Sequence, residues 1–134
     1  MASLIDSSVL IEIERGRIDL AALLGESGDR EVGMAAISGA EILAGVDRPR
    51  SAVGRLRSLA LVEAIIAAIP VIPFDLPCAR THARIAGNLR SRGITIATND
   101  LMIAATALTR GMTVVTRDRR SFPRIPGLVV DLLP

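Results

Sequence analysis

Short runs of apolar residues alternate with longer helix-like segments along the chain, and this alternation limits the possible folds more than any other feature. The strand-like runs cover residues 2–6, 32–37, 71–74, 114–116 and 128–132. Helical stretches separate most of these runs, so the strands are expected to lie parallel with helices on both faces. The pattern predicts a three-layer α/β fold with a mostly parallel central sheet of about five strands. Because 134 residues suit one core and no linker or repeat interrupts them, we expect a single domain, 1–134.

Helix boundaries are marked by residues that start or stop helices. We expect Pro49 to open a long helix and Asp75 and Asn99 to cap two later helices, whereas Gly93 and Gly111 end them. The predicted helices cover residues 8–15, 18–25, 38–46, 51–69, 75–92 and 99–111. In the long helix, Leu56, Leu59, Val62, Ile66 and Ile69 recur at helical spacing and predict its buried stripe.

Composition excludes several kinds of protein. All sixteen basic residues are arginines, so mechanisms that need a lysine amine are excluded, such as a P-loop, a Schiff base or a phospho-receiver switch. The single cysteine, Cys78, cannot form an internal disulfide and fits a reducing compartment. No signal peptide is recognisable, and the longest apolar stretch, residues 64–73, is too short to cross a membrane. We therefore expect a cytoplasmic protein.

Four acidic residues take similar positions relative to the predicted strands. Asp6 and Asp118 follow strands directly, Glu41 lies one turn into the helix after the second strand, and Asp100 starts the helix that leads to the fourth. Sites in open parallel sheets form at the carboxyl ends of the strands, so one fold brings all four acids together. Clustered carboxylates repel unless a cation lies between them, and oxygen ligands favour Mg²⁺ or Mn²⁺. Such sites commonly hydrolyse phosphate esters.

Each of these acids also has a simpler interpretation. Ser38 and Glu41 fit a capping box, in which the Glu side chain reaches back to the first amide of its own helix. Asp100 suits the positive end of a helix dipole, and Asp6 and Asp118 could cap the helices that follow them.

Other candidate side chains are assigned structural roles. Cys78 and His82 are spaced for one helix face, but a closed zinc site needs more Cys or His ligands than the chain offers, so packing is favoured. The acids flanked by arginines are expected on the solvated surface: Glu12, Glu14, Asp19, Glu26, Asp29, Glu31 and Asp47.

Five segments, taken in their order along the chain, resemble the PIN-domain ribonucleases, specifically the VapC-type toxins of type II toxin–antitoxin pairs. They are residues 4–8 (LIDSS), 38–45 (SGAEILAG), 99–105 (NDLMIAA), 116–122 (TRDRRSF) and 125–128 (IPGL). The resemblance covers nearly the whole chain in the order and spacing of the family. It implies an endoribonuclease that depends on Mg²⁺ or Mn²⁺ and is inhibited by a VapB-type antitoxin. It also implies a homodimer, and promoter DNA bound only through the antitoxin.

The family's acidic residues carry over as Asp6, Glu41, Asp100 and Asp118. We expect Asp6 and Asp100 to hold the principal cation, with Asp118 and Glu41 completing the site. Residues expected to line the substrate pocket are Ser7, Thr116 and Arg117, the arginine as a candidate for a flanking phosphate.

Alternative functions stay open at this point. The chain could be a PIN-fold nuclease of RNA maturation outside toxin–antitoxin systems, or a PIN-fold module that only binds other proteins. Leu61 and Ile65 widen the apolar surface of the long helix. This surface predicts either an interface, with a second protomer or an antitoxin helix, or packing on a neighbouring helix of the same chain.

Overall fold

A parallel sheet of five strands forms the centre of the computed structural model, which describes residues 2–25, 31–48 and 51–134. The strands are β1 (Ser3–Ile5), β2 (Val32–Ala35), β3 (Val71–Ile72), β4 (Thr113–Thr116) and β5 (Val130–Leu132). Their order across the sheet is β3-β2-β1-β4-β5, and every neighbouring pair is parallel. The predicted α/β class and strand count are confirmed. Met1, Pro49, Glu26 and Asp29 lie outside the described residues, so the predictions that concern them stay predictions.

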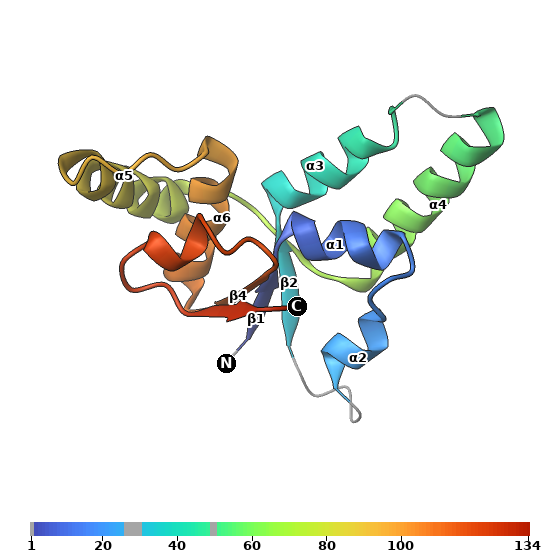
Figure 1. The fold of residues 1–134 in the computed structure, drawn as a ribbon, viewed down its shortest axis with the longest axis horizontal. Coiled ribbons are helices and arrows are strands. Elements are labelled where there is room, and N and C mark those ends of the chain that lie inside the picture. The colour runs from blue at the N-terminus through green and yellow to red at the C-terminus, as the bar shows by residue number, and fades with distance from the viewer. Residues whose placement is uncertain (1, 26–30, 49–50) are drawn as a thin grey trace.

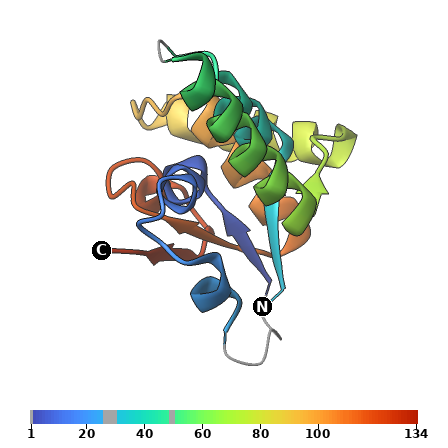
Figure 2. The ribbon, with the colours of Figure 1, turned by 90° about the vertical axis from the view of Figure 1, so that its right-hand side faces the viewer.

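Six helices and one short 3-10 turn connect the strands in the described part of the chain. The helices are α1 (Ser7–Glu14), α2 (Leu20–Leu24), α3 (Ala36–Gly45), α4 (Ala52–Ala68), α5 (Leu76–Ser91) and α6 (Thr98–Arg110), and the turn is η1 (Phe122–Arg124). Figures 1 and 2 show α5 and α6 on one side of the sheet and α1, α3 and α4 on the other. This is the three-layer arrangement expected from the sequence.

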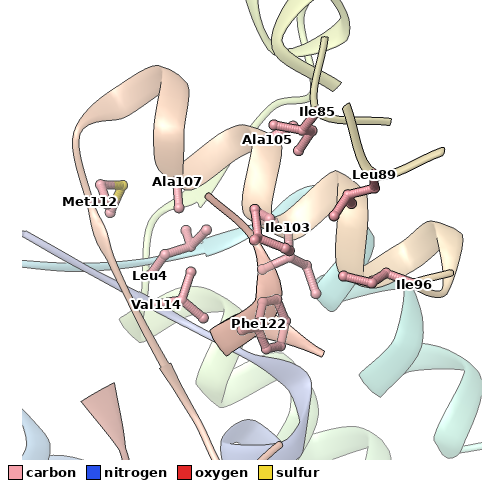
Figure 3. Packing of buried hydrophobic residues seen from close by; sticks show 13 residues of the cluster. Leu4, Ile85, Leu89, Ile96, Ile103, Ala105, Ala107, Met112, Val114 and Phe122 are labelled. Carbon is pink, nitrogen blue, oxygen red and sulfur yellow. The ribbon is translucent and has the colours of Figure 1, made fainter. Parts of the chain in front are cut away.

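Successive strand residues point to opposite faces of the sheet and divide the core in two. Leu4 and Val114 join a cluster with α5, α6 and η1, which Figure 3 shows around Ile103 and Phe122. The next residue of β1, Ile5, belongs to the second cluster, with α1, α3 and α4. Apolar residues on both faces explain why these strands read as continuous apolar runs rather than alternating ones.

Several helix signals are confirmed and two are wrong. The Asp75 side chain accepts a hydrogen bond from the Cys78 backbone amide and caps α5, and Gly111 ends α6 in the left-handed conformation. The predicted cap Asn99 is wrong, because Ala97 occupies that position and α6 starts at Thr98. Ser38 is not a cap either. Helix α3 begins directly after β2, at Ala36, and leaves the Ser38 side chain fully buried.

The predicted stripe of α4 is only partly correct. Val62 and Ile69 are buried as expected, and so is Ile65, which we had placed outside the stripe. Leu56, which we had placed inside it, is 63% exposed, and Leu61 is 43% exposed. The apolar residues of α4 surround much of the helix, so their spacing alone does not identify the covered face.

Cys78 and His82 belong to the packing of α5, as predicted. Cys78 is fully buried and its Sγ donates to the Pro73 carbonyl, with 3.9 Å between sulfur and oxygen. The His82 ring packs edge-on against Phe74, with 6.0 Å between ring centres. No helix within the described ranges has the length and apolar character needed to cross a membrane.

Candidate active site

The candidate site begins where two neighbouring strands end. Asp6 directly follows β1, and Thr116 is the last residue of β4, the strand that pairs with β1. The Asp6 side chain is 3% exposed, and its Oδ2 accepts hydrogen bonds of 2.8 Å from the hydroxyls of Thr116 and Ser8. Adjacent parallel strands therefore place an acid and the hydroxyl that fixes it side by side.

Glu41 joins this centre from α3. The Ser7 hydroxyl lies between the two acids, 3.3 Å from Glu41 Oε1 and 3.5 Å from Asp6 Oδ1. Glu41 is the sixth residue of α3, two residues further into the helix than predicted, because α3 starts at Ala36 and not at Ser38. Because the helix starts at Ala36, the Glu41 side chain is not needed for a capping box and faces Ser7 instead.

Asp100 and Asp118 reach the same edge from α6 and from the loop after β4. The Asp118 backbone amide donates to Thr116 Oγ1 over 2.9 Å, so one hydroxyl positions two of the acids. Asp118 Oδ1 in turn accepts from the backbone amides of Arg120 and Ser121, at 2.8 and 3.1 Å. The Ser121 side chain acts on both carboxylates, because its hydrogen bonding lowers the pKa of Asp118 and opposes the rise in the pKa of Asp100.

Mutual repulsion of the acids is visible in their electrostatics. The pKa of Glu41 is raised by burial and by the charges of Asp6 and Asp100, against hydrogen bonds from Ser7 and Asn99 that lower it. The pKa of Asp100 is raised by burial and by the charges of Asp6 and Asp118. Each raised value depends on two other members of the set. The structure thus brings the four predicted acids together, although it does not test their individual roles.

Asp118 differs from Glu41 and Asp100 in the direction of its pKa shift. Its burial alone would raise the pKa, but hydrogen bonds from Arg120 and Ser121 and the positive charge of Arg120 lower it below its ordinary value. This carboxylate is therefore ionised more easily than those of Glu41 and Asp100, at the side of the site where the chain is richest in arginine.

The donor set fits a hard divalent cation, but the ligand shell is not preassembled. All the gathered acids offer oxygen, which Mg²⁺ and Mn²⁺ prefer. The hydroxyls of Ser8 and Thr116 donate to Asp6 Oδ2, whereas the one hydrogen-bond contact of Oδ1 among the described residues is the 3.5 Å contact with Ser7. Among the residues that the structure describes, no three Asp, Glu, His or Cys side chains already stand in a metal-binding arrangement.

Arg117 lies beside the site and is tied to the fold. Its Nη1 lies 3.3 Å from Glu12 Oε2, its Nε donates to the Pro134 carbonyl oxygen, and its backbone amide donates to Ser8 Oγ. Its expected contact with a phosphate stays a prediction. The prediction that Glu12 lies on the solvated surface is wrong, because Glu12 is 7% exposed and also lies near Arg15 and Arg17.

Three polar side chains of this site were not predicted: Ser8, Asn99 as a donor, and Ser121. Each stands next to, or within three residues of, a predicted acid, so the only sequence signal is a small polar residue beside a candidate ligand. That signal is weak, because Ser and Asn are common in turns and at helix starts for other reasons.

Comparisons with known proteins agree over the full length. The PIN domain family matches residues 3–128. Ribonuclease VapC1 of Rickettsia felis is 36% identical over 130 residues, which are 97% of this chain and 95% of the relative. Ribonuclease VapC of Rickettsia bellii is 34% identical over 134 residues, which are 100% and 98% of the two chains.

Solved structures show the same architecture. A VapBC complex of Salmonella typhimurium bound to DNA matches with a TM-score of 0.87 and 26% identity, covering 98% of this chain and 97% of that one. VapBC-5 of Mycobacterium tuberculosis matches with a TM-score of 0.75 and 31% identity over the same shares. The family match, the two full-length relatives and the shared fold lead to one conclusion: the chain belongs to the PIN-domain family and, within it, to the VapC ribonucleases.

Proposed function

We propose that the chain is the endoribonuclease toxin of a type II toxin–antitoxin pair and hydrolyses RNA phosphodiester bonds with the help of Mg²⁺ or Mn²⁺. The observation that carries this proposal is the gathering of Asp6, Glu41, Asp100 and Asp118 at one edge of the sheet. Full-length relatives that are named ribonucleases support the reaction. The oxygen-only donor set supports the choice of cation.

Asp6 and Asp100 are the proposed principal ligands, with Asp118 and Glu41 completing the site. A bound Mg²⁺ or Mn²⁺ supplies Lewis-acid polarisation of the phosphate oxygens and makes an attacking water easier to deprotonate. The hydroxyls of Ser8 and Thr116 hold the Asp6 carboxylate in a fixed orientation, as outer hydrogen bonds do in metal sites. Glu41, across Ser7 from Asp6, is placed to orient the attacking water or to accept its proton.

The proposed protein partner is a VapB-type antitoxin. The Salmonella typhimurium neighbour is a VapBC complex bound to DNA, and that of Rickettsia felis is VapBC2 bound to a fragment of the VapBC promoter, with a TM-score of 0.88 and 21% identity. By analogy, this chain would form a homodimer, be neutralised by the antitoxin, and reach promoter DNA only through it. A cytoplasmic location follows from the proposed substrate.

The test compares two site variants with a matched control. Asp6→Asn and Asp100→Asn remove one proposed ligand charge each and should lower cleavage of labelled RNA by about 100-fold or more, since each charge helps to hold the cation. Asp75→Asn makes the same chemical change at a helix cap that Asn can also occupy. Asp75 pairs with Arg110, at the opposite end of α6 from Asp100, and its substitution should leave cleavage unchanged.

Removal of the metal ion provides a second test of the proposed function. EDTA should abolish cleavage by the unaltered protein, and Mg²⁺ or Mn²⁺ should restore it. Co-expression of the antitoxin encoded beside this chain should relieve growth inhibition. Full activity of Asp6→Asn or Asp100→Asn, or full activity in excess EDTA, would contradict the proposal.

A further inference from the structure

Three arginines gather on the segment that follows β4. Arg119, Arg120 and Arg124 line a surface hollow of about 450 Å³, and all three residues are exposed. The same segment carries Asp118 and Ser121 of the candidate site, so the hollow and the acids share one short stretch of chain. We call this group the arginine cluster.

The arginine cluster has no close carboxylate partner among the described residues, although the charge of Arg120 lowers the pKa of Asp118. Some of the other arginines pair with acids: Arg15, Arg17 and Arg117 with Glu12, Arg55 with Asp47, and Arg110 with Asp75. Within the described residues, no Asp or Glu oxygen lies within 4.0 Å of a guanidinium nitrogen of the cluster. With a net charge of only +2 for the whole chain, three unpaired cations in six residues are a local surplus that an anion would offset.

Hydrogen bonds hold the chain segment that carries the arginine cluster next to the acids. Arg124 Nε donates to the Arg120 carbonyl oxygen over 2.7 Å, and its Nη2 donates over 3.2 Å to that of Thr95, in the loop before α6. The Arg120 backbone amide donates to Asp118 Oδ1 over 2.8 Å. Arg124 thus braces the segment, whereas the side chains of Arg119 and Arg120 have no hydrogen-bond partner in the described part of the chain.

We propose that Arg119 and Arg120 bind backbone phosphates of the RNA substrate on one side of the scissile bond, with Arg124 holding their segment in place. This inference rests on the proposed function, because the arginine cluster would supply the positive charge for RNA binding that the acid site lacks. The four carboxylates repel a polyanion, and a cationic flank beside Asp118 would hold the strand against that repulsion. Arginine forks bind phosphate oxygens in pairs without reading sequence, so this contact serves RNA of any sequence.

The test uses double variants of equal charge. Arg119→Ala/Arg120→Ala and the control Arg57→Ala/Arg84→Ala both remove two exposed arginines, the control pair from α4 and α5. We expect the first to raise the KM for a labelled single-stranded RNA 12-mer about fivefold per arginine with little change in kcat. In EDTA, the same 12-mer should bind more weakly, and the slope of log K against log salt should become shallower by about 0.7 per contact.

Each outcome separates the two proposals. If the unaltered protein does not cleave RNA with Mg²⁺ or Mn²⁺, the proposed function fails. The binding of the RNA 12-mer in EDTA then still decides whether the arginine cluster binds RNA. If cleavage occurs but KM, binding and salt slope match those of the control, the inference is overturned. It is also overturned if the cluster variant keeps RNA binding and loses only the binding of a polyglutamate peptide, since the cluster would then serve an acidic protein segment.

Discussion

Asp6 owes its orientation to neutral hydroxyls rather than to arginine. Three hydroxyl groups surround its nearly buried carboxylate, and no arginine lies within ion-pair distance among the described residues. Thr116 is the most connected of these groups, because its oxygen donates to Asp6 and accepts from the Asp118 amide. A carboxylate satisfied in this way keeps its negative charge available to a cation.

Removing this one hydroxyl should therefore disturb two acids. Thr116→Val keeps the branched shape but removes one of the two hydrogen bonds to Asp6 Oδ2 and leaves the Asp118 amide without its partner. We expect the free energy of unfolding to fall by about 1–3 kcal/mol. RNA cleavage should fall by about 10–100-fold, as for lost outer partners of metal ligands. Urea unfolding and initial cleavage rates measure the two effects.

The control is another threonine whose hydroxyl is hydrogen-bonded. Thr109 donates to the Ala105 carbonyl and contacts Thr81, between α6 and α5 and toward the end of α6 remote from Asp100. Thr109→Val should reduce stability without a selective loss of cleavage. Equal effects of the two substitutions on cleavage would show that Thr116 acts through general stability alone.

Residue-scale prediction succeeded where position along a strand decides and failed where distant contacts decide. The positions of Asp6 and Asp118 were predictable because strand ends can be recognised from short apolar runs, whereas Thr116 was named through the resemblance to the PIN-domain family. The hydroxyl of Ser8 was not, since its partner Thr116 comes from the far end of the chain. Glu12 was misassigned for the same reason: its burial depends on Arg117, which no local pattern connects to α1.

At the scale of elements, α3 shows how a plausible helix signal can mislead. The sequence offers a capping box at Ser38, yet the chain turns from β2 into the helix at once, with Ala35 as the last extended residue. The strand's end is fixed by its pairing with β1 and β3, which overrides a local cap worth about 1 kcal/mol. This earlier start also places Glu41 two residues further into the helix, where its side chain faces Ser7.

The two interpretations of Ser38 predict different stabilities. Its buried hydroxyl has no hydrogen-bond partner in the described part of the structure, so Ser38→Ala should cost nothing or raise stability slightly. Ser51 is a true cap, because its hydroxyl accepts from the Gly54 amide at 3.0 Å. Ser51→Ala should therefore lower the free energy of unfolding by about 1 kcal/mol.

Thermal unfolding of the two serine variants side by side would measure this difference. A loss for Ser38→Ala as large as that for Ser51→Ala would restore the capping interpretation. It would also contradict the explanation that the Glu41 side chain faces Ser7 because no capping box needs it. The succession of strands and helices along the chain, in contrast, was predictable, because it follows from the spacing of apolar residues in many segments rather than from one cap.

At the scale of the whole molecule, the fold brings acids from four separate segments to one edge of the sheet, where the charge of Arg120 lowers the pKa of Asp118 while the pKa values of Glu41 and Asp100 are raised. The raised pKa values of Glu41 and Asp100 have a consequence for stability. A carboxyl whose pKa is higher in the folded state stabilises the fold most at low pH. That contribution is lost as the pH rises through the raised value. The site is thus a source of instability at neutral pH.

This instability should be measurable and reversible. The ordinary pKa is 4.5 for Glu and 3.8 for Asp, so the stability contributed by Glu41 and Asp100 is lost at pH values above these. The lowered pKa of Asp118 changes stability only at pH values below 3.8. Above pH 4.5, Glu41→Gln should therefore raise the melting temperature of the metal-free protein as the pH rises through the raised pKa of Glu41, by about 2–5 °C once that carboxyl is ionised. Glu63→Gln, which removes an exposed charge from α4, should not.

Divalent cations provide the complementary measurement. Mg²⁺ binds the ionised carboxylates of the native state, so it should raise the melting temperature of the unaltered protein more at pH 8 than at pH 5. The gain should be smaller in Glu41→Gln and unchanged in Glu63→Gln, because only the first removes a charge from the site. If Mg²⁺ has no effect at either pH while RNA cleavage proceeds, the acids act without a cation. Their repulsion would then have to be offset by the substrate complex itself.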